Sequence, residues 1–70
     1  AIHCNTEEKA NALLIVLNRV GKEWISGDSY LAENNWRFEK TKTCYGLDGS
    51  YGISEWYDDV YEFDDIDLNN

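Results

Sequence analysis

The chain of 70 residues has a formal net charge of −8 and carries ten aromatic residues and two cysteines. A single domain of this size buries only about 60% of its unfolded surface, so most of its large apolar side chains are needed for the core. The acidic balance excludes broad binding to a nucleic-acid backbone, because Lys and Arg must neutralise the phosphates. No run approaches the roughly 20 apolar residues of a membrane span. Cys4 and Cys44 lie too far apart for a metal knuckle and are too few for a disulfide framework. A first residue other than methionine is typical of a processed or trimmed chain.

The first predicted elements are the end of a strand at residues 2 to 4 and an amphipathic helix over residues 5 to 21. Asn5 is the expected N-cap, with Glu8 reaching back to it, and Gly21 is the expected left-handed stop. One stripe of the helix is apolar and must be covered by the rest of the chain. It consists of Ala10, Leu13, Leu14, Leu17 and Val20, with Val16 on its edge.

The middle of the chain predicts short extended segments separated by turns. Residues 22 to 26 precede a Gly-Asp-Ser turn cluster and are interpreted as a strand, and residues 29 to 33 as a loop or one helical turn. After the break at Asn34 and Asn35, apolar Trp36 and Phe38 alternate with charged neighbours, which favours a strand. The alternation changes parity near Lys40, and a bulge or turn there would bring Cys44 to the buried side.

Asp48 and Gly49 give the strongest turn signal, because this pair tolerates the positive φ angles of a tight hairpin. We expect residues 41 to 47 to pair with residues 50 to 57, and a final short strand around Tyr61 and Phe63. The predicted fold is α+β, with one N-terminal amphipathic helix packed on a small antiparallel or mixed sheet of three to five strands. It forms a single compact domain over residues 1–70, with an acidic C-terminal segment at residues 55–70.

Four parts of the sequence together carry a resemblance: WISGDS at residues 24–29, Trp36, TCY at 43–45 and YEFDDI at 61–66. In spacing and residue type the chain resembles a group of small uncharacterised proteins encoded by phages and prophages of low-GC Gram-positive bacteria. Members of that group carry a longer segment before the final strand than residues 55 to 60 here. The resemblance implies a small accessory protein of the host cytoplasm and brings no catalytic residues.

Patterns of catalytic and metal-binding residues are weak throughout. His3 and Cys4 point to opposite faces of a strand, and a pair of His3 with Cys44 would lack an orienting group and an oxyanion site. Asp65 opens the start of a calcium loop that lacks the glycine and the final glutamate of such loops. Adjacent carboxylates such as Asp58 and Asp59 diverge on a strand and do not form an acid–base pair. We therefore expect no enzyme activity, no metal and no cofactor.

Charge is segregated along the chain. The final segment contains acids and no base: Glu55, Asp58, Asp59, Glu62, Asp64, Asp65 and Asp67. Half of the basic residues, Arg37, Lys40 and Lys42, lie within six positions. Ile15 falls on the polar back face of the helix, where an exposed branched residue is either an ordinary surface residue or a contact with a partner or with a second copy of the chain.

Three functional hypotheses follow. The leading one is a non-enzymatic, phage-encoded inhibitor whose acidic segment mimics phosphates and binds a basic, nucleic-acid-handling host protein, without contacting nucleic acid or a membrane. Glu62 and Asp64, as alternate strand residues, would match the spacing of phosphates along one DNA strand. The alternative is a sponge for a nucleotide messenger, built from Arg37, Lys40 and Lys42 with the aromatic residues Trp36, Tyr45 and Trp56. An enzyme is the third and weakest.

Overall fold

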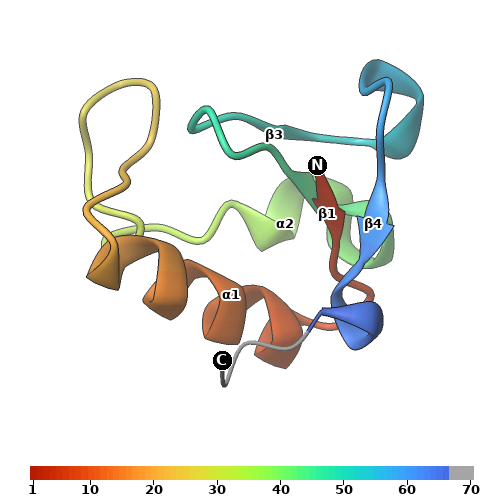
Figure 1. Cartoon of the computed structure of the whole chain (residues 1–70), viewed down its shortest axis with the longest axis horizontal. Coiled ribbons are helices and arrows are strands. Elements are labelled where there is room, and N and C mark those ends of the chain that lie inside the picture. The colour runs from red at the N-terminus through yellow and green to blue at the C-terminus, as the bar shows by residue number, and fades with distance from the viewer. Residues whose placement is uncertain (67–70) are drawn as a thin grey trace.

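The computed structural model describes residues 1–66 and confirms the α+β architecture. Helix α1 (Glu7–Arg19) packs on a four-stranded mixed sheet of order β3-β2-β1-β4 (Figure 1). The strands are β1 (Ile2–His3), β2 (Cys44–Tyr45), β3 (Tyr51–Gly52) and β4 (Tyr61–Glu62). The other elements are helix α2 (Trp36–Glu39) and three 3₁₀ helices, η1 (Lys40–Lys42), η2 (Ser54–Trp56) and η3 (Phe63–Asp65). Within the described part of the chain, every helix is too short to cross a bilayer.

Helix α1 forms where it was predicted, but its cap differs. The N-cap is Thr6, whose hydroxyl accepts a hydrogen bond from the Lys9 amide at 3.2 Å, so the prediction of Asn5 was wrong by one residue. The Asn5 side chain instead accepts from the Lys9 ammonium. Gly21 has the predicted positive φ. The predicted stripe is buried at Ala10, Leu13, Leu14 and Leu17, whereas Val20 follows the last helical residue and is exposed.

Two predicted strands are absent from the described residues. At residues 22 to 26 the backbone serves a turn and a neighbouring loop: the Trp24 amide donates to the Asp28 carbonyl, and the Ile25 amide donates to the Gly49 carbonyl. Residues 36 to 39 form the single turn of α2, after Asn35 in a left-handed conformation, and the Asn34 carboxamide oxygen accepts from the Trp36 amide at 3.0 Å. The predicted break at Lys40 is present, with a φ of 50°, and Cys44 is fully buried as expected.

The Asp48–Gly49 hairpin is confirmed, but it is shorter than predicted. Strands β2 and β3 pair antiparallel over two residue pairs, and the Gly46 amide donates to the Ser50 carbonyl across the turn. The Asp48 carboxylate accepts from the Ser50 hydroxyl at 2.6 Å. Pairing stops there because residues 54 to 56 turn into η2. The last strand, β4, pairs parallel with β1 and ends where η3 begins at Phe63.

The core lies between α1, the sheet and the segment from Trp24 to the start of α2. Trp24 packs edge-on against Tyr30 with ring centroids 4.7 Å apart, and Tyr45 is completely buried beside them. Two of these rings also hold the loop that follows Tyr30. The Trp24 indole N–H donates to the Glu33 carbonyl at 2.8 Å, and the Tyr45 hydroxyl donates to the Asn34 carbonyl at 2.6 Å. The loop is thereby fixed from beneath by buried side chains.

Candidate binding surfaces

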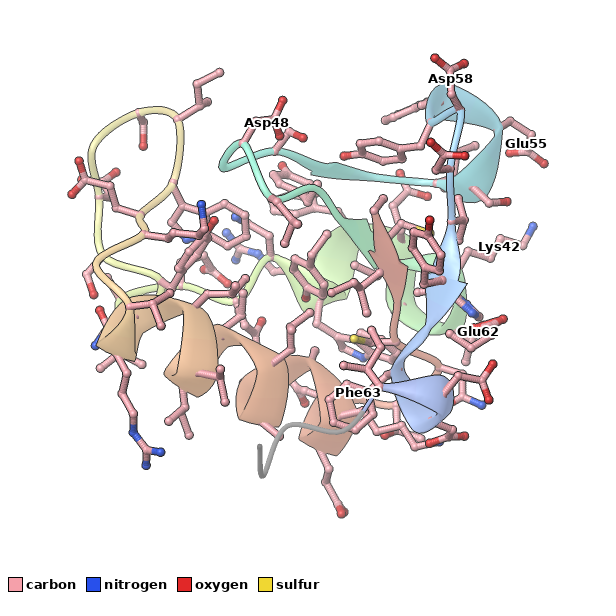
Figure 2. The ribbon with its side chains drawn as sticks, in the orientation of Figure 1. Lys42, Asp48, Glu55, Asp58, Glu62 and Phe63 are labelled. Carbon is pink, nitrogen blue, oxygen red and sulfur yellow. The ribbon has the colours of Figure 1, made fainter. Side chains whose placement is uncertain are left out.

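Six carboxylates of η2, β4, η3 and the segment between them form one exposed border, which we call the acidic edge. Its members are Glu55, Asp58, Asp59, Glu62, Asp64 and Asp65. Figure 2 shows Glu55, Asp58 and Glu62 following one side of the molecule, with Lys42 among them. Asp67, the seventh predicted member, lies outside the described residues. Four of the six carboxylates, those of Glu55, Asp58, Asp59 and Asp65, have neither a hydrogen bond nor an ion pair within residues 1–66.

The other two carboxylates are engaged within the molecule. Glu62 lies 2.6 Å from His3 Nδ1, and Asp64 accepts from the Lys9 ammonium at 2.8 Å. Glu62 is the last residue of β4, while Asp64 belongs to η3, so an extended strand does not continue from one to the other. The prediction that these two residues alternate along one strand is therefore wrong, and the carboxylates without a partner within residues 1–66 are those of the other four members.

His3 links three segments through its ring. Nδ1 bonds to the Glu62 carboxylate, and Nε2 lies 2.8 Å from the Thr41 carbonyl oxygen. Carboxylate and carbonyl oxygens only accept, so both ring nitrogens must donate, and the geometry favours the imidazolium. Burial is the largest influence and lowers the pKa of His3, but the Thr41 carbonyl and the Glu62 carboxylate together raise it above 6.5. The ring thus ties β1 to β4 and to the Thr41 backbone beneath the acidic edge.

Two aromatic side chains are exposed within the acidic edge. Trp56 of η2 is 65% exposed and Tyr61 of β4 is 61% exposed. The indole of Trp56 lies against Gly52, where a Cβ atom would collide with the ring. Nearby, the Tyr57 and Ser50 hydroxyls are 2.9 Å apart, which holds η2 against the hairpin. Large aromatic residues among charged ones are typical of protein-binding surfaces rather than of a surface that serves only solubility.

The structure does not assemble the predicted nucleotide site. Tyr45 is fully buried and its hydroxyl is used by Asn34, so it cannot stack on a base. Arg37 lies over the Phe38 ring and 3.5 Å from the Glu33 carboxylate, while Trp36 packs against the core. The remaining predicted residues are exposed on separate elements, Lys40 and Lys42 on η1 and Trp56 on η2. Of these, Lys42 lines a pocket of about 270 Å³ with His3, Glu55 and Glu62, where the charges of both signs are balanced.

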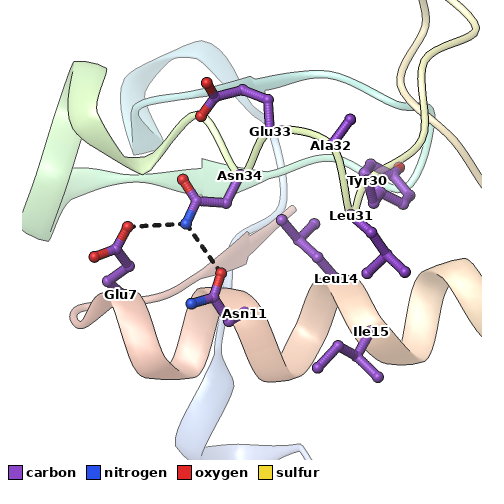
Figure 3. A pocket seen from close by; sticks show the side chains of 9 residues that line it. All are labelled: Glu7, Asn11, Leu14, Ile15, Tyr30, Leu31, Ala32, Glu33 and Asn34. Carbon is purple, nitrogen blue, oxygen red and sulfur yellow. Dashed lines mark hydrogen bonds between the residues drawn. The ribbon is translucent and has the colours of Figure 1, made fainter.

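A second region of interest lies around the loop that follows Tyr30. A groove of about 560 Å³ separates this loop from α1, and Leu14, Ile15 and Leu31 line it (Figure 3). A second groove of about 460 Å³ lies between the loop and the hairpin and is lined by Trp24, Ile25 and Tyr51 among others. Ala32 and Glu33 line both grooves. Residues 31 to 35 therefore form a ridge between two hollows.

Asn34 fixes this ridge, a role that the sequence did not predict. Its side-chain N–H group donates to the Glu7 carboxylate and to the Asn11 carboxamide, both at 2.9 Å (Figure 3). Its own carboxamide oxygen accepts a hydrogen bond from the Trp36 amide at the start of α2. The Asn34–Asn35 pair indicated only a break in the chain, because its partners on α1 lie more than twenty positions away in sequence.

Buried thiols do not provide a reactive group. Burial, and then the neighbouring Cys44, raises the pKa of Cys4 to about 12, so Cys4 stays protonated at neutral pH. Cys44 faces His3 in the β1–β2 register, but both nitrogens of the His3 ring are already bonded elsewhere. Residues 1–66 contain no group of three or more His, Cys, Asp or Glu side chains placed to hold a metal ion.

Comparison of the chain with protein-family models, with curated proteins and with solved structures finds no match. No family therefore assigns a role to any residue. What the protein does must be inferred from the acidic edge and from the two grooves.

Proposed function

We propose that this chain is a non-enzymatic binding protein whose acidic edge docks on a basic surface of another protein. One observation carries the proposal: the exposed rings of Trp56 and Tyr61 belong to the same stretch of chain as the carboxylates of Glu55, Asp58 and Asp59, which have no internal partner within residues 1–66. An acidic cluster alone is common on soluble proteins, but exposed aromatic anchors within it supply the apolar contacts that a specific interface needs.

Charged and apolar side chains of the acidic edge contribute to different steps of binding. Free carboxylates at Glu55, Asp58 and Asp59 attract a basic partner over several ångströms and raise the rate of encounter, while the net charge of −8 repels acidic proteins. Trp56 and Tyr61 then lose water against the partner and slow dissociation. Glu62 and Asp64 take a different part, because their bonds to His3 and Lys9 hold the edge in place.

Proteins that handle nucleic acids are the favoured partners, because their basic surfaces are built to receive closely spaced negative charges. Because the chain resembles phage accessory proteins, we infer that this partner is a host defence protein and that the chain inhibits it in the host cytoplasm. Docking of this kind needs carboxylates at the border of the molecule and does not need the regular spacing of a strand.

Capture of partners from a bacterial lysate, followed by mass spectrometry, tests the proposal. One variant carries Glu55→Gln, Asp58→Asn and Asp59→Asn. Its matched control carries Glu8→Gln, Glu23→Gln and Glu39→Gln, which changes the net charge by the same three units at residues outside the acidic edge.

We expect the wild type and the control to capture the same basic protein and the edge variant to lose it. With the partner purified, the association rate of the edge variant should fall at least about tenfold at low salt, and the wild-type rate should fall as salt rises. Equal loss of partner binding in both variants would show that only net charge matters and would contradict a specific role of the acidic edge. Release of a bound nucleotide from the captured chain would favour the sponge instead.

A further inference from the structure

We propose that the two grooves beside residues 31–35 form a second docking surface, for a peptide segment of a partner in which large apolar residues alternate with Lys or Arg. We call it the groove surface: the residues that line either groove. It shares no residue with the acidic edge, and Figure 1 shows the loop that leaves the C-terminal end of α1 and strand β4 on opposite sides of the molecule, with the chain running back from that loop to α2 between them. The inference therefore stands independently of the function proposed above.

Three of the exposed large apolar side chains line these two grooves. Leu31 is 61% exposed and faces α1 beside Ile15, which is 43% exposed, in the first groove (Figure 3). Ile25, 79% exposed, lines the second groove next to the half-buried ring of Tyr51. A chain this small needs most of its large apolar side chains for the core, so leaving three aliphatic side chains around one ridge is costly unless a partner covers them.

The charges around the grooves select the partner. Glu7 and Glu33 line the first groove, Asp28 and Glu33 line the second, and neither lining includes a Lys or an Arg. Arg37 approaches Glu33 from outside, at 3.5 Å and with both side chains largely exposed, which neutralises little. A segment carrying Lys or Arg complements this rim. A second copy of the chain, with a charge of −8, would bring like charges together.

The ridge is already ordered in the free protein. Buried Trp24 and Tyr45 donate to the carbonyls of Glu33 and Asn34, and the Asn34 side chain bonds to α1. A preformed surface loses little conformational entropy on binding, so a short segment can bind it with useful affinity. An extended segment crossing the ridge would turn its apolar side chains toward the two grooves, while its Lys or Arg side chains leave from the opposite face and are long enough to bend back to the acidic rim.

A fluorescein-labelled peptide of alternating leucine and arginine is the probe, with fluorescence anisotropy as the measurement. Two peptides of equal length serve as controls, one with serine in place of leucine and one with glutamate in place of arginine. We expect the leucine–arginine peptide to bind at least about tenfold more tightly than either control. Binding of the serine–arginine peptide with equal affinity would show attraction by charge alone and overturn the proposal.

Variants of the protein locate the site. Leu31→Ser and Ile25→Ser should each weaken binding at least about fivefold. Val20→Ser is the matched control, since Val20 is as exposed as Leu31 but lines neither groove, and it should leave binding unchanged. The acidic-edge variant should retain the peptide, which separates a failure of this proposal from a failure of the previous one.

Mapping of backbone amide resonances by NMR provides the final discrimination. On addition of the leucine–arginine peptide, shifts should centre on residues 31 to 35 and on the first turns of α1. Shifts centred on residues 55 to 62 would overturn the groove surface. The free protein could also dimerise as its concentration rises. If Leu31→Ser abolished that dimerisation, the groove surface would belong to a second copy of the chain, and the proposal of a partner peptide would be overturned.

Discussion

Two glycines with nearly the same backbone angle allow the packing around the hairpin turn to be measured. Gly27 has a φ of 93° and Gly49 a φ of 91°. A Cβ atom built on Gly27 meets no other atom within 4 Å. On Gly49 it would lie 2.6 Å from the Ile25 amide nitrogen and 2.7 Å from the Glu23 carbonyl oxygen. Substitution by alanine therefore adds the strain of a positive φ at both positions, and a collision with backbone only at Gly49.

The expected costs differ accordingly. Gly27→Ala should lower the free energy of unfolding by about 1 kcal/mol, the cost of a left-handed conformation for a residue with a side chain. Gly49→Ala should also push the hairpin away from residues 23 to 25 and break the Ile25–Gly49 hydrogen bond. The free energy of unfolding should therefore fall by a total of about 3 kcal/mol or more. A domain of 70 residues has a total stability of only about 4 to 10 kcal/mol.

Urea unfolding followed by tryptophan fluorescence measures both variants under the same conditions. The informative quantity is the difference between them, because the shared strain cancels. A difference below about 0.5 kcal/mol would refute the close contact between the Gly49 turn and residues 23 to 25. A Gly49→Ala chain that is unfolded in the absence of urea would agree with the larger cost.

Three further measurements address the helix, the histidine and a thiol. Leu14→Ala should destabilise by about 2 to 5 kcal/mol because Leu14 is fully buried, whereas Ile15→Ala should cost less than about 1 kcal/mol; the reverse order in urea unfolding would show that the helix phase is wrong. Because the pKa of His3 is raised on folding, its bonds contribute fully below pH 6.5, and this stability should be lost as pH rises through the folded pKa. His3→Gln should flatten that part of the profile, and a profile that keeps its slope would contradict the ion pair with Glu62. Cys4 should resist a thiol reagent at about pH 8 in the native protein and react on denaturation, since its folded pKa is about 12; rapid native labelling would contradict its burial.

Elements specified by neighbouring residues were predictable from the sequence. The apolar stripe places α1, and Asp48 with Gly49 places the hairpin turn, because these signals act over a few positions. The extended segment at residues 22 to 26 failed for the opposite reason. Trp24 is buried and Ile25 exposed, as on a strand, but a strand also needs a partner strand, and here the backbone bonds to a turn and to Gly49. The pairing of distant segments cannot be seen in a local pattern.

The candidate surfaces show the same division. Segregation of the acids was visible in the sequence, and so was the exposure of Ile15. The engagement of Glu62 by His3 was not, because 59 positions separate the two residues. The grooves depend on the placement of residues 31 to 35 by Trp24, Asn34 and Tyr45, each of which has an ordinary alternative role as a core or loop residue.

Strand order has a consequence for how the chain acquires its structure. Strand β1 lies between β2 and β4, so the first of these strands to be synthesised must wait for the second and for the last. Helix α1 can begin to form at once, but the sheet that covers its apolar stripe cannot close before residue 62 is available. Closing so long a loop costs entropy that is recovered only at the end, which is typical of slower folding. The apolar face of α1 is therefore exposed while residues 20 to 62 are synthesised, and chaperones can bind it during that time.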